Sequence, residues 1–255
     1  MIKSILRMTP EEIIRLKPDD VNRPLEVEEI EHIFRSLGAF YRHPGEKNIK
    51  APHPRLTTMK HSDIYINCPI VLCHSNLCQI MARQSAYHFR NIYSGEVNWV
   101  TGSDSSALGF SKDFANALGA KWNPMQKVKN EGEDERQVWE KMVIGPNETV
   151  LHTEELGVTS VTALRVRKGI RDAHPDYPIK FIPVLPMLVF RPSEKDFPSD
   201  TPAIIDGSVV LPVLDYRTFV VDPKKETCPL CAKGSEALSP KGPNWEIMMA
   251  ALKEN

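Results

Sequence analysis

The sequence predicts an α/β fold in which a central parallel sheet is flanked by helices. Between residues 97 and 190, segments rich in β-branched and aromatic residues alternate with segments of helical periodicity. Each connection is long enough to return the chain for a further parallel strand. With 255 residues, 41% of them hydrophobic, the chain is long enough to bury a substantial core.

The composition excludes several classes of protein. The formal net charge of −1 argues against a generally polycationic nucleic-acid binder. The longest apolar run, residues 181–190, is interrupted by Pro183 and Pro186 and is too short to span a membrane, so we expect no membrane partner. Charged residues near the N-terminus argue against a secretion signal. Five cysteines without a disulfide framework predict reduced thiols and a cytoplasmic location.

The N-terminal part, residues 1–50, is predicted to be a helical extension. The stretch Thr9–Glu12 supplies a capping hydroxyl, a proline for the first turn and two acids, which is typical of a helix start. A second helix is expected over residues 27–37, where Ile30 and Phe34 share one face, and Gly38 ends it.

The middle of the chain, residues 51–225, is predicted to form the main α/β domain. We expect strands at 65–72, 97–101, 149–153 and 180–190, and helices at 77–93, 107–118 and 162–173. The charged stretch 127–140 has little apolar content and is interpreted as a mobile loop. Residues 192–255 are proline-rich and expected to be less regular, with residues 226–255 forming a C-terminal tail.

The segment 149–163 carries the strongest chemical signal. An apolar strand ends in the adjacent acids Glu154 and Glu155, crosses a turn containing Thr159 and Ser160, and enters a helix at Thr162. Ligands bind at the carboxyl ends of such strands, and a helix start offers free N–H groups to a phosphate. The two carboxylates could accept hydrogen bonds from the hydroxyl groups of a sugar. The alternative is an ordinary strand–turn–helix with capping residues.

A second turn follows the same logic. The strand at 97–101 runs into Gly102-Ser103-Asp104-Ser105-Ser106 and then into a helix. Small residues let the backbone approach an anion closely. Such a cluster is also a routine helix cap, but two such turns in one sheet favour a polyphosphate ligand.

With both turns in view, the chain resembles the type I phosphoribosyltransferases, and most closely their orotate phosphoribosyltransferase branch. Four segments carry the resemblance. They are Leu56–Asn67, similar to the family's substrate hairpin; Gly102–Ser106, at the place of the pyrophosphate loop; Glu154–Thr162, similar to the signature that binds phosphoribosyl pyrophosphate (PRPP); and Phe190-Arg191, similar to the pair whose arginine meets the orotate carboxylate. The resemblance implies a central parallel sheet with a small hood.

The resemblance also implies a mechanism and its residues. PRPP binds with Mg²⁺, and its phosphoribosyl group passes to a nucleobase such as orotate with release of pyrophosphate. The implied PRPP-binding residues are Gly102, Ser103, Asp104, Ser105, Ser106, Glu154, Glu155, Thr159, Ser160, Val161 and Thr162. The implied base-binding residues are Thr57, Lys60, Tyr65, Ile66 and Arg191, and the implied catalytic residues are Lys127 and Glu155. A homodimer is implied, in which the mobile loop of one subunit covers the site of its partner.

Three departures from the family pattern keep a second function open. Glu155 stands where Asp is common, and Ser160 and Val161 replace the glycines of the phosphate loop. The stretch 126–132 offers Lys127 but no histidine. The alternative to catalysis is therefore a regulatory protein of the same fold that binds PRPP or a nucleotide.

The segment Cys228-Pro-Leu-Cys231 is half of a zinc-ribbon pattern. The remaining cysteines, Cys68, Cys73 and Cys78, do not repeat its spacing. Zinc would need distant Cys or His ligands or a partner chain, and would favour an interaction module. We favour a turn with two thiols and expect no metal site.

His61 is open to two interpretations, substrate contact or a local hydrogen bond.

Overall fold

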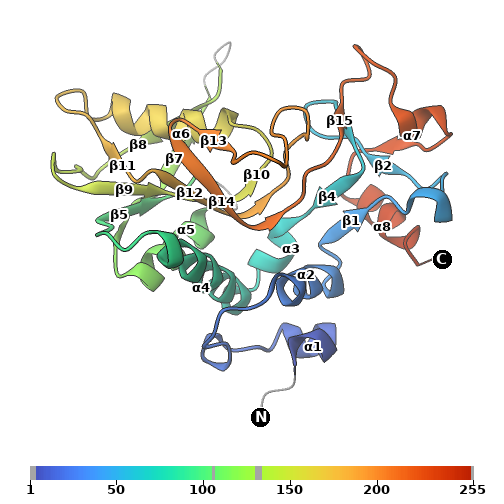
Figure 1. The fold of residues 1–255 in the computed structure, drawn as a ribbon, viewed down its shortest axis with the longest axis horizontal. Coiled ribbons are helices and arrows are strands. Elements are labelled where there is room, and N and C mark those ends of the chain that lie inside the picture. The colour runs from blue at the N-terminus through green and yellow to red at the C-terminus, as the bar shows by residue number, and fades with distance from the viewer. Residues whose placement is uncertain (1–3, 105–106, 130–133, 254–255) are drawn as a thin grey trace.

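A sheet of parallel strands forms the centre of the molecule (Figure 1), and the structure, a computed structural model, describes residues 4–104, 107–129 and 134–253. One half of the sheet has the strand order β11 (Lys180–Phe181), β9 (Thr149–His152), β5 (Trp99–Thr101) and β6 (Lys121–Trp122). The other half has the order β10 (Glu154–Gly157), β12 (Val184–Phe190), β14 (Ser208–Asp215) and β13 (Ile204–Ile205). Within these two sets all pairings are parallel except that of β13 with β14, which confirms the predicted fold class.

The two halves join where two strands bend. β9 and β10 are separated only by Thr153, and its hydroxyl donates to the carbonyl oxygen of Pro186 at 3.0 Å. Before the bend Val150 pairs with Phe181, whereas after it Glu154 pairs with Met187, so the register shifts by two residues. The predicted strand at 149–153 is thus present as β9 and continues beyond the bend as β10, and the predicted strand at 180–190 is present as β11 and β12.

Helices cover both faces of the sheet, as the sequence predicts. α4 (Ser75–Ile92) and α5 (Ala107–Leu118) pack on one face, where Val100 and Leu151 point. On the other face α6 (Val161–Asp172) packs with Trp99 and Val150. Neighbouring residues of one strand thus belong to two different hydrophobic clusters. Because both faces of the strand are buried, its sequence is a continuous apolar run.

The charged stretch 127–140, expected to be a mobile loop, instead contains an antiparallel hairpin. β7 (Met125–Val128) pairs with β8 (Arg136–Trp139), while residues 130–133 lie outside the described residues. Met125 and Trp139 are buried against α6 and anchor the hairpin to the sheet. Gly169 of α6 permits this approach, because a Cβ there would lie 1.9 Å from the backbone oxygen of Gln137.

The two helices predicted in the N-terminal part are present. α1 (Pro10–Ile13) begins with the capping box of Thr9 and Glu12, and α2 (Val27–Ser36) is followed by Gly38 at φ 68°. Two short 3₁₀ helices, Ile5–Arg7 and Pro18–Asp20, complete this part. Its apolar side chains join the main core beneath α4, so the extension is not a separate layer.

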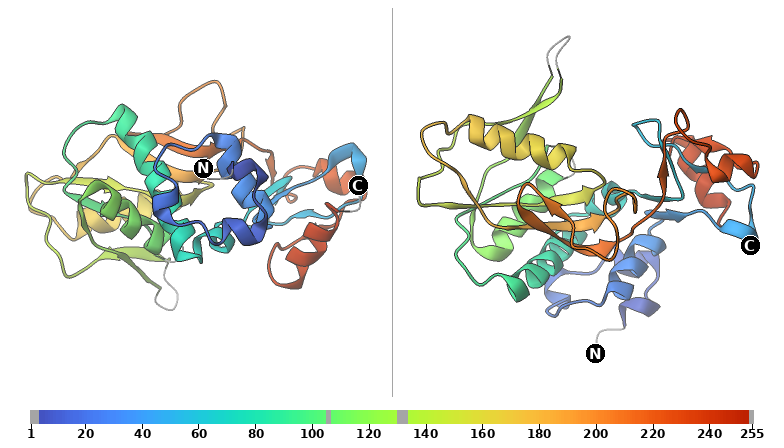
Figure 2. Two further views of the ribbon diagram at one scale, coloured as in Figure 1. Left: turned by 90° about the horizontal axis from the view of Figure 1, so that it is seen from below. Right: turned by 45° about the horizontal axis from the view of Figure 1, so that its top comes forward.

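A small hood stands beside the sheet (Figures 1 and 2). Its members come from two stretches of the chain, residues 40–66 and 220–250: β1 (Phe40–Arg42), a 3₁₀ helix (Gly45–Lys47), β2 (His53–Pro54), β3 (His61–Ser62), β4 (Ile64–Ile66), β15 (Val220–Val221), α7 (Pro229–Ala232), β16 (Ala237–Leu238) and α8 (Pro243–Ala250). β1 pairs with β4, β2 with β16, and β3 with β15. The C-terminal segment is therefore part of the hood.

Two further predictions of secondary structure are wrong. The strand expected over 65–72 ends at Ile66, and α3 (Cys68–Leu72) follows, since Pro69 suits a helical first turn. The less regular region after residue 192 contains β14, one of the longest strands. Pro212 lies within this strand, and β13 pairs with β14 only at Ser208 and Val209. Pro212 therefore needs no ladder bond on that side.

The described part of the chain has no helix that is long and apolar enough to cross a membrane.

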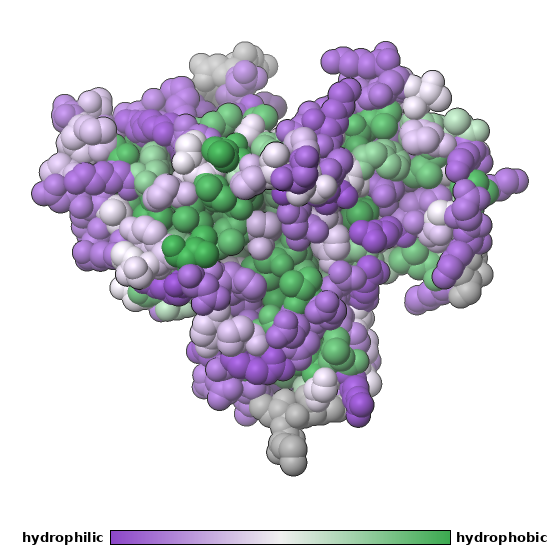
Figure 3. Space-filling view, viewed as in Figure 1, coloured by the Kyte–Doolittle hydropathy of each residue, from purple (hydrophilic) through white to green (hydrophobic). Residues whose placement is uncertain are grey.

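Hydrophobic side chains gather over the middle of the face in Figure 3, where β13 and β14 lie. Ile204 and Val209, which pair across these two strands, are 61% and 42% exposed.

Candidate functional site

The two turns predicted to bind phosphate meet at Ser103 and Glu154. The backbone N–H of Ser103 donates to Oε1 of Glu154 at 3.2 Å, and the Ser103 hydroxyl donates to Oε2 at 2.5 Å. Both side chains are buried. Gly102 allows this close approach, because a Cβ there would lie 2.8 Å from the backbone oxygen of Thr153. The turn after β5 is thus fixed against the bend between β9 and β10.

His152 is a member of this arrangement that the sequence analysis missed. It is fully buried, and its Nε2 lies 2.6 Å from Oε1 of Glu154. The signal was present, because residues two apart in a strand share a face, and His152 precedes Glu154 by two. The Glu154 carboxylate therefore accepts three hydrogen bonds from the protein, and it serves to position Ser103.

A small cavity lies beside the turn that leads into α6. Its volume is about 120 Å³, and its lining includes Glu154, Gly157, Thr159 and Thr162. The Ser160 side chain makes no capping hydrogen bond at the start of α6. The predicted phosphate-binding residues Thr159, Ser160, Val161 and Thr162 are all exposed or half-buried. This turn therefore combines open space, hydroxyl groups and a helix N-terminus, which together suit a phosphate.

The missing glycines do not strain this turn. Among the described residues of the turn there is no positive φ: Ser160 has φ −74°, and Val161 is the first residue of α6. The valine therefore occupies an ordinary helical position, and the turn reaches the helix without the left-handed residue that glycine would favour.

Glu155 makes its contacts on a different side from Glu154. Its backbone oxygen accepts from the Cys68 thiol of α3 at 3.6 Å. Burial, and after it the Glu155 charge, raises the pKa of Cys68 well above its usual value. Because successive side chains of a strand point to opposite faces, the two acids do not form one paired surface for a sugar.

The hairpin β7–β8 reaches the turn after β5. The backbone N–H of Asp104 donates to the side-chain oxygen of Gln137 on β8 at 3.4 Å. Lys127, the predicted catalytic residue, lies on β7, and its Nζ pairs with Glu135 at 2.6 Å. Two further residues of the predicted pyrophosphate loop, Ser105 and Ser106, lie outside the described residues.

The predicted base-binding residues lie in the hood or at its junction with the sheet. Thr57 is exposed, Lys60 and Tyr65 are half-buried, and Ile66 is buried. Tyr65 packs against Trp245 of α8, with ring centroids 5.6 Å apart.

Arg191 joins the sheet to the hood. It follows β12, is 2% exposed, and donates through Nη1 to the Ser62 hydroxyl at 3.1 Å and to the Ile64 carbonyl at 3.0 Å. Burial lowers the pKa of its guanidinium to about 10. Two hydrogen bonds thus tie Nη1 of Arg191 to the hood, and base binding by this arginine stays a prediction.

The largest cavity described, about 570 Å³, lies elsewhere. Asp19, Arg83, Tyr87 and Arg90 are among its lining residues, together with Leu118 at the C-terminal end of α5. The turn after β5 precedes the opposite end of that helix. The cavity is therefore separate from the predicted phosphate site.

Comparison with known proteins gives likenesses of structure alone. No protein-family model and no curated protein matches the chain. A UMP synthase from Leishmania donovani is 14% identical with a TM-score of 0.49, covering 77% of this chain and 37% of that one. The chain thus spans little more than a third of that protein's length.

Two further similar structures are phosphoribosyltransferases. The orotate phosphoribosyltransferase from Aeropyrum pernix is 13% identical with a TM-score of 0.48, covering 72% of this chain and 91% of that one. The adenine phosphoribosyltransferase from Thermoanaerobacter pseudethanolicus is 11% identical with a TM-score of 0.45, covering 60% of this chain and 88% of that one. At these identities and TM-scores, a function for this chain has to come from its own residues.

Proposed function

We propose that the chain binds PRPP, carrying Mg²⁺, and transfers its phosphoribosyl group to a nucleobase. The observation that carries this proposal is the hydrogen-bonded contact between Ser103 and Glu154. It joins the turn after β5 to the start of β10, the strand that leads into the turn before α6. Both turns follow the carboxyl ends of parallel strands, the place where open α/β sheets bind ligands. A ligand with a phosphate at each end of a sugar suits two such turns.

Each part of PRPP has a proposed position. The 5′-phosphate binds at the start of α6, where Thr159 and Thr162 line the small cavity. The pyrophosphate with its Mg²⁺ binds at the turn that begins with Gly102 and Ser103, and Glu154 holds that turn in place. Glu155 remains a candidate for the ribose and the reacting carbon.

In the proposed reaction, the bond between C1′ and the pyrophosphate oxygen breaks, and its electron pair leaves with pyrophosphate. A ring nitrogen of the base forms the new bond to C1′, and its proton passes to the released pyrophosphate or to water. The protein mainly positions the reactants and stabilises the leaving charge. Lys127 is the proposed cation for that charge, and it would have to leave Glu135 to reach it.

The proposed base is orotate-like and lies under the hood, near Thr57, Lys60, Tyr65 and Ile66. Because Arg191 is bonded to Ser62 and Ile64, we assign the recognition of an acidic base to Lys60 in its place. The proposed setting is cytoplasmic, supported by five cysteines that are all unpaired.

A second candidate is a regulatory protein that binds PRPP or a nucleotide without turnover. The ion pair between Lys127 and Glu135 favours it, because the proposed catalytic cation is already neutralised within its own hairpin.

One experiment separates these functions. Calorimetry would titrate PRPP with Mg²⁺, ribose 5-phosphate and nucleoside monophosphates into the protein, and a pyrophosphate-release assay would add orotate, uracil, adenine, hypoxanthine and guanine in turn. Binding with release of pyrophosphate supports the transferase, and binding without release supports the regulator. No binding of any of these compounds by folded protein contradicts both.

A further inference from the structure

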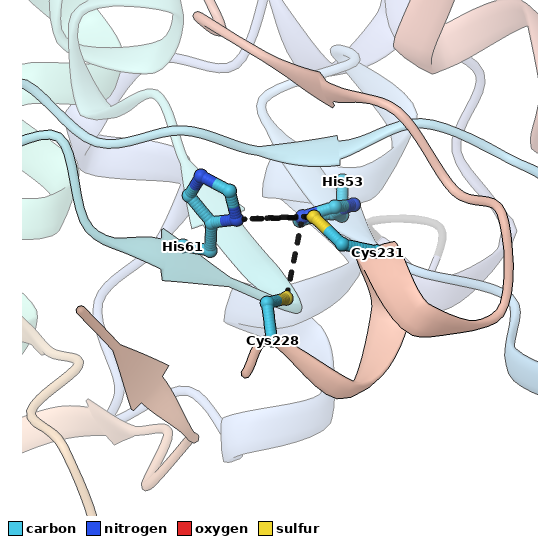
Figure 4. Close-up of side chains that lie close together, drawn as sticks. All are labelled: His53, His61, Cys228 and Cys231. Carbon is cyan, nitrogen blue, oxygen red and sulfur yellow. Dashed lines mark hydrogen bonds between the residues drawn. The ribbon is translucent and has the colours of Figure 1, made fainter. Parts of the chain in front are cut away.

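Four side chains that are distant in the sequence converge in the hood (Figure 4). His53 of β2 and His61 of β3 meet Cys228, the residue before α7, and Cys231, which lies within α7. One nitrogen or sulfur atom from each lies within 4.8 Å of all the others. His53, His61 and Cys228 are buried, and Cys231 is exposed. The sequence analysis saw only the two thiols, whereas folding adds two imidazoles to them.

Four of the six distances between the ligand atoms fit one tetrahedral metal ion, and the other two are within 4.8 Å. Zinc bonds of the usual length, arranged tetrahedrally, separate two nitrogens by roughly 3.3 Å and a nitrogen from a sulfur by roughly 3.6 Å. Here Nε2 of His53 lies 3.2 Å from Nδ1 of His61. The same Nε2 lies 3.6 Å from each sulfur, and Nδ1 of His61 lies 3.4 Å from the Cys231 sulfur.

The surroundings of His53 leave its Nε2 as the atom with the free lone pair. The Ser235 hydroxyl donates to the carbonyl oxygen of Ala51 at 2.5 Å. That hydroxyl proton is therefore committed, so at 2.7 Å the Ser235 oxygen accepts from Nδ1 of His53. An imidazole protonated on Nδ1 presents an unprotonated Nε2, which here points at the two sulfurs. Metal-binding histidines are commonly oriented by such a second hydrogen bond.

We propose that His53, His61, Cys228 and Cys231 bind one Zn²⁺ ion as a closed structural site. Two imidazoles and two thiolates are a ligand set that zinc takes in structural sites, and four protein ligands leave no position for a substrate. Both thiols lose their protons when the ion binds, which leaves the site with no net charge.

The site would clamp the C-terminal segment onto the hood. β2 pairs with β16 over two residues and β3 with β15 over two residues, so the hydrogen-bonded ladders alone are short. The ion would lie between these pairs and link residues 53 and 61 to residues 228 and 231. It would also support α8, whose Trp245 packs on Tyr65. His61 is then a metal ligand and not a substrate contact.

The test is metal analysis of the full chain purified without added metal or chelator. We expect one zinc per chain by elemental mass spectrometry in the unmodified protein and in Cys73→Ser, whose exposed thiol lies outside the cluster. Cys228→Ser and His53→Ala should lose the zinc. Removal of zinc by a chelator should lower the melting temperature of the unmodified protein, and adding zinc back should restore it.

A cobalt spectrum covers the case in which a variant fails to fold. Unmodified protein that is stripped of metal and loaded with Co²⁺ should show the intense visible bands of tetrahedral cobalt and a thiolate charge-transfer band. Three results would overturn the proposal: no zinc before or after incubation with zinc, an octahedral cobalt spectrum, or a Cys228–Cys231 disulfide in protein purified under reducing conditions.

Discussion

The Glu154 carboxylate accepts hydrogen bonds from both the backbone N–H and the hydroxyl of Ser103, across 51 residues of sequence. This contact turns two separate strand ends into one polar edge. With His152, this contact occupies three of the roughly four acceptor positions of the carboxylate. We infer that Glu154 is a positioning residue, and we expect its effect on a ligand to pass through the turn that begins with Gly102.

The first prediction concerns this contact. In Glu154→Gln one carboxylate oxygen becomes an NH₂ group, which cannot accept from Ser103 or His152. We expect affinity for PRPP to fall about tenfold, equivalent to about 1.4 kcal/mol, as measured by calorimetry. Asp172→Asn, at the far end of α6, is the control and should bind as the unmodified protein does. Unchanged affinity in folded Glu154→Gln would show that the turn needs no such support.

Lys127 gives the second prediction. Lys127→Ala should reduce pyrophosphate release by about 10²–10³-fold, because a cation that stabilises the leaving charge is lost. PRPP affinity should change much less. Lys168→Ala, an exposed lysine of α6, serves as the control. If the two variants turn over equally fast, the catalytic cation is a different residue.

The third prediction compares two glycines in helices. Gly169→Ala places a Cβ 1.9 Å from the backbone oxygen of Gln137, so it should displace the hairpin and cost about 1–3 kcal/mol in the free energy of unfolding. Gly109→Ala meets only Cys78 at 3.7 Å and should stabilise by up to about 1 kcal/mol. Urea unfolding measures both. Equal effects would mean that the hairpin does not rest on α6.

The fourth prediction concerns acid stability. Glu148 accepts from the Trp99 indole at 2.8 Å and from the Gly145 N–H at 2.7 Å, and it pairs with Lys121. These contacts, with Lys121 the strongest, lower its pKa from 4.5 to about 2. Because the folded pKa is the lower one, the stabilisation is present above pH 4.5 and is lost as the pH falls toward 2.

Glu148→Gln should therefore lower the free energy of unfolding at pH 7 by about 1 kcal/mol, allowing for the partial exposure of the pair. Its stability should then vary less between pH 4.5 and 2 than that of the unmodified protein. Glu226→Gln, an exposed acid, is the matched control. Parallel pH profiles for Glu148→Gln and the unmodified protein would contradict the assignment.

The fifth prediction, which the resemblance to type I phosphoribosyltransferases implies, is that the chain forms a homodimer. Light scattering at micromolar concentration should give twice the mass of one chain. A monomeric mass would exclude this arrangement.

Sequence alone determined much of the fold. The helices at 107–118 and 162–173 and the caps at Thr9 and Gly38 follow from local signals, namely apolar spacing, a capping hydroxyl and a glycine. The strand end at Thr101 is equally local, whereas the strand expected to end at Thr153 bends there and continues as β10. For this reason the parallel sheet and its two polar turns were predictable.

Only the tertiary structure decided what those residues contact. Hydrogen bonds between Ser103 and Glu154, and the meeting of Cys228 with His53 across 175 residues, depend on how strands pair and bend. The contacts of Arg191 also depend on tertiary structure, because its Nη1 donates to Ser62 and Ile64 of the hood. Periodicity records which face of an element is buried, because that depends on neighbours in the chain. It does not record which distant element arrives at that face, since that is fixed by packing of the whole molecule.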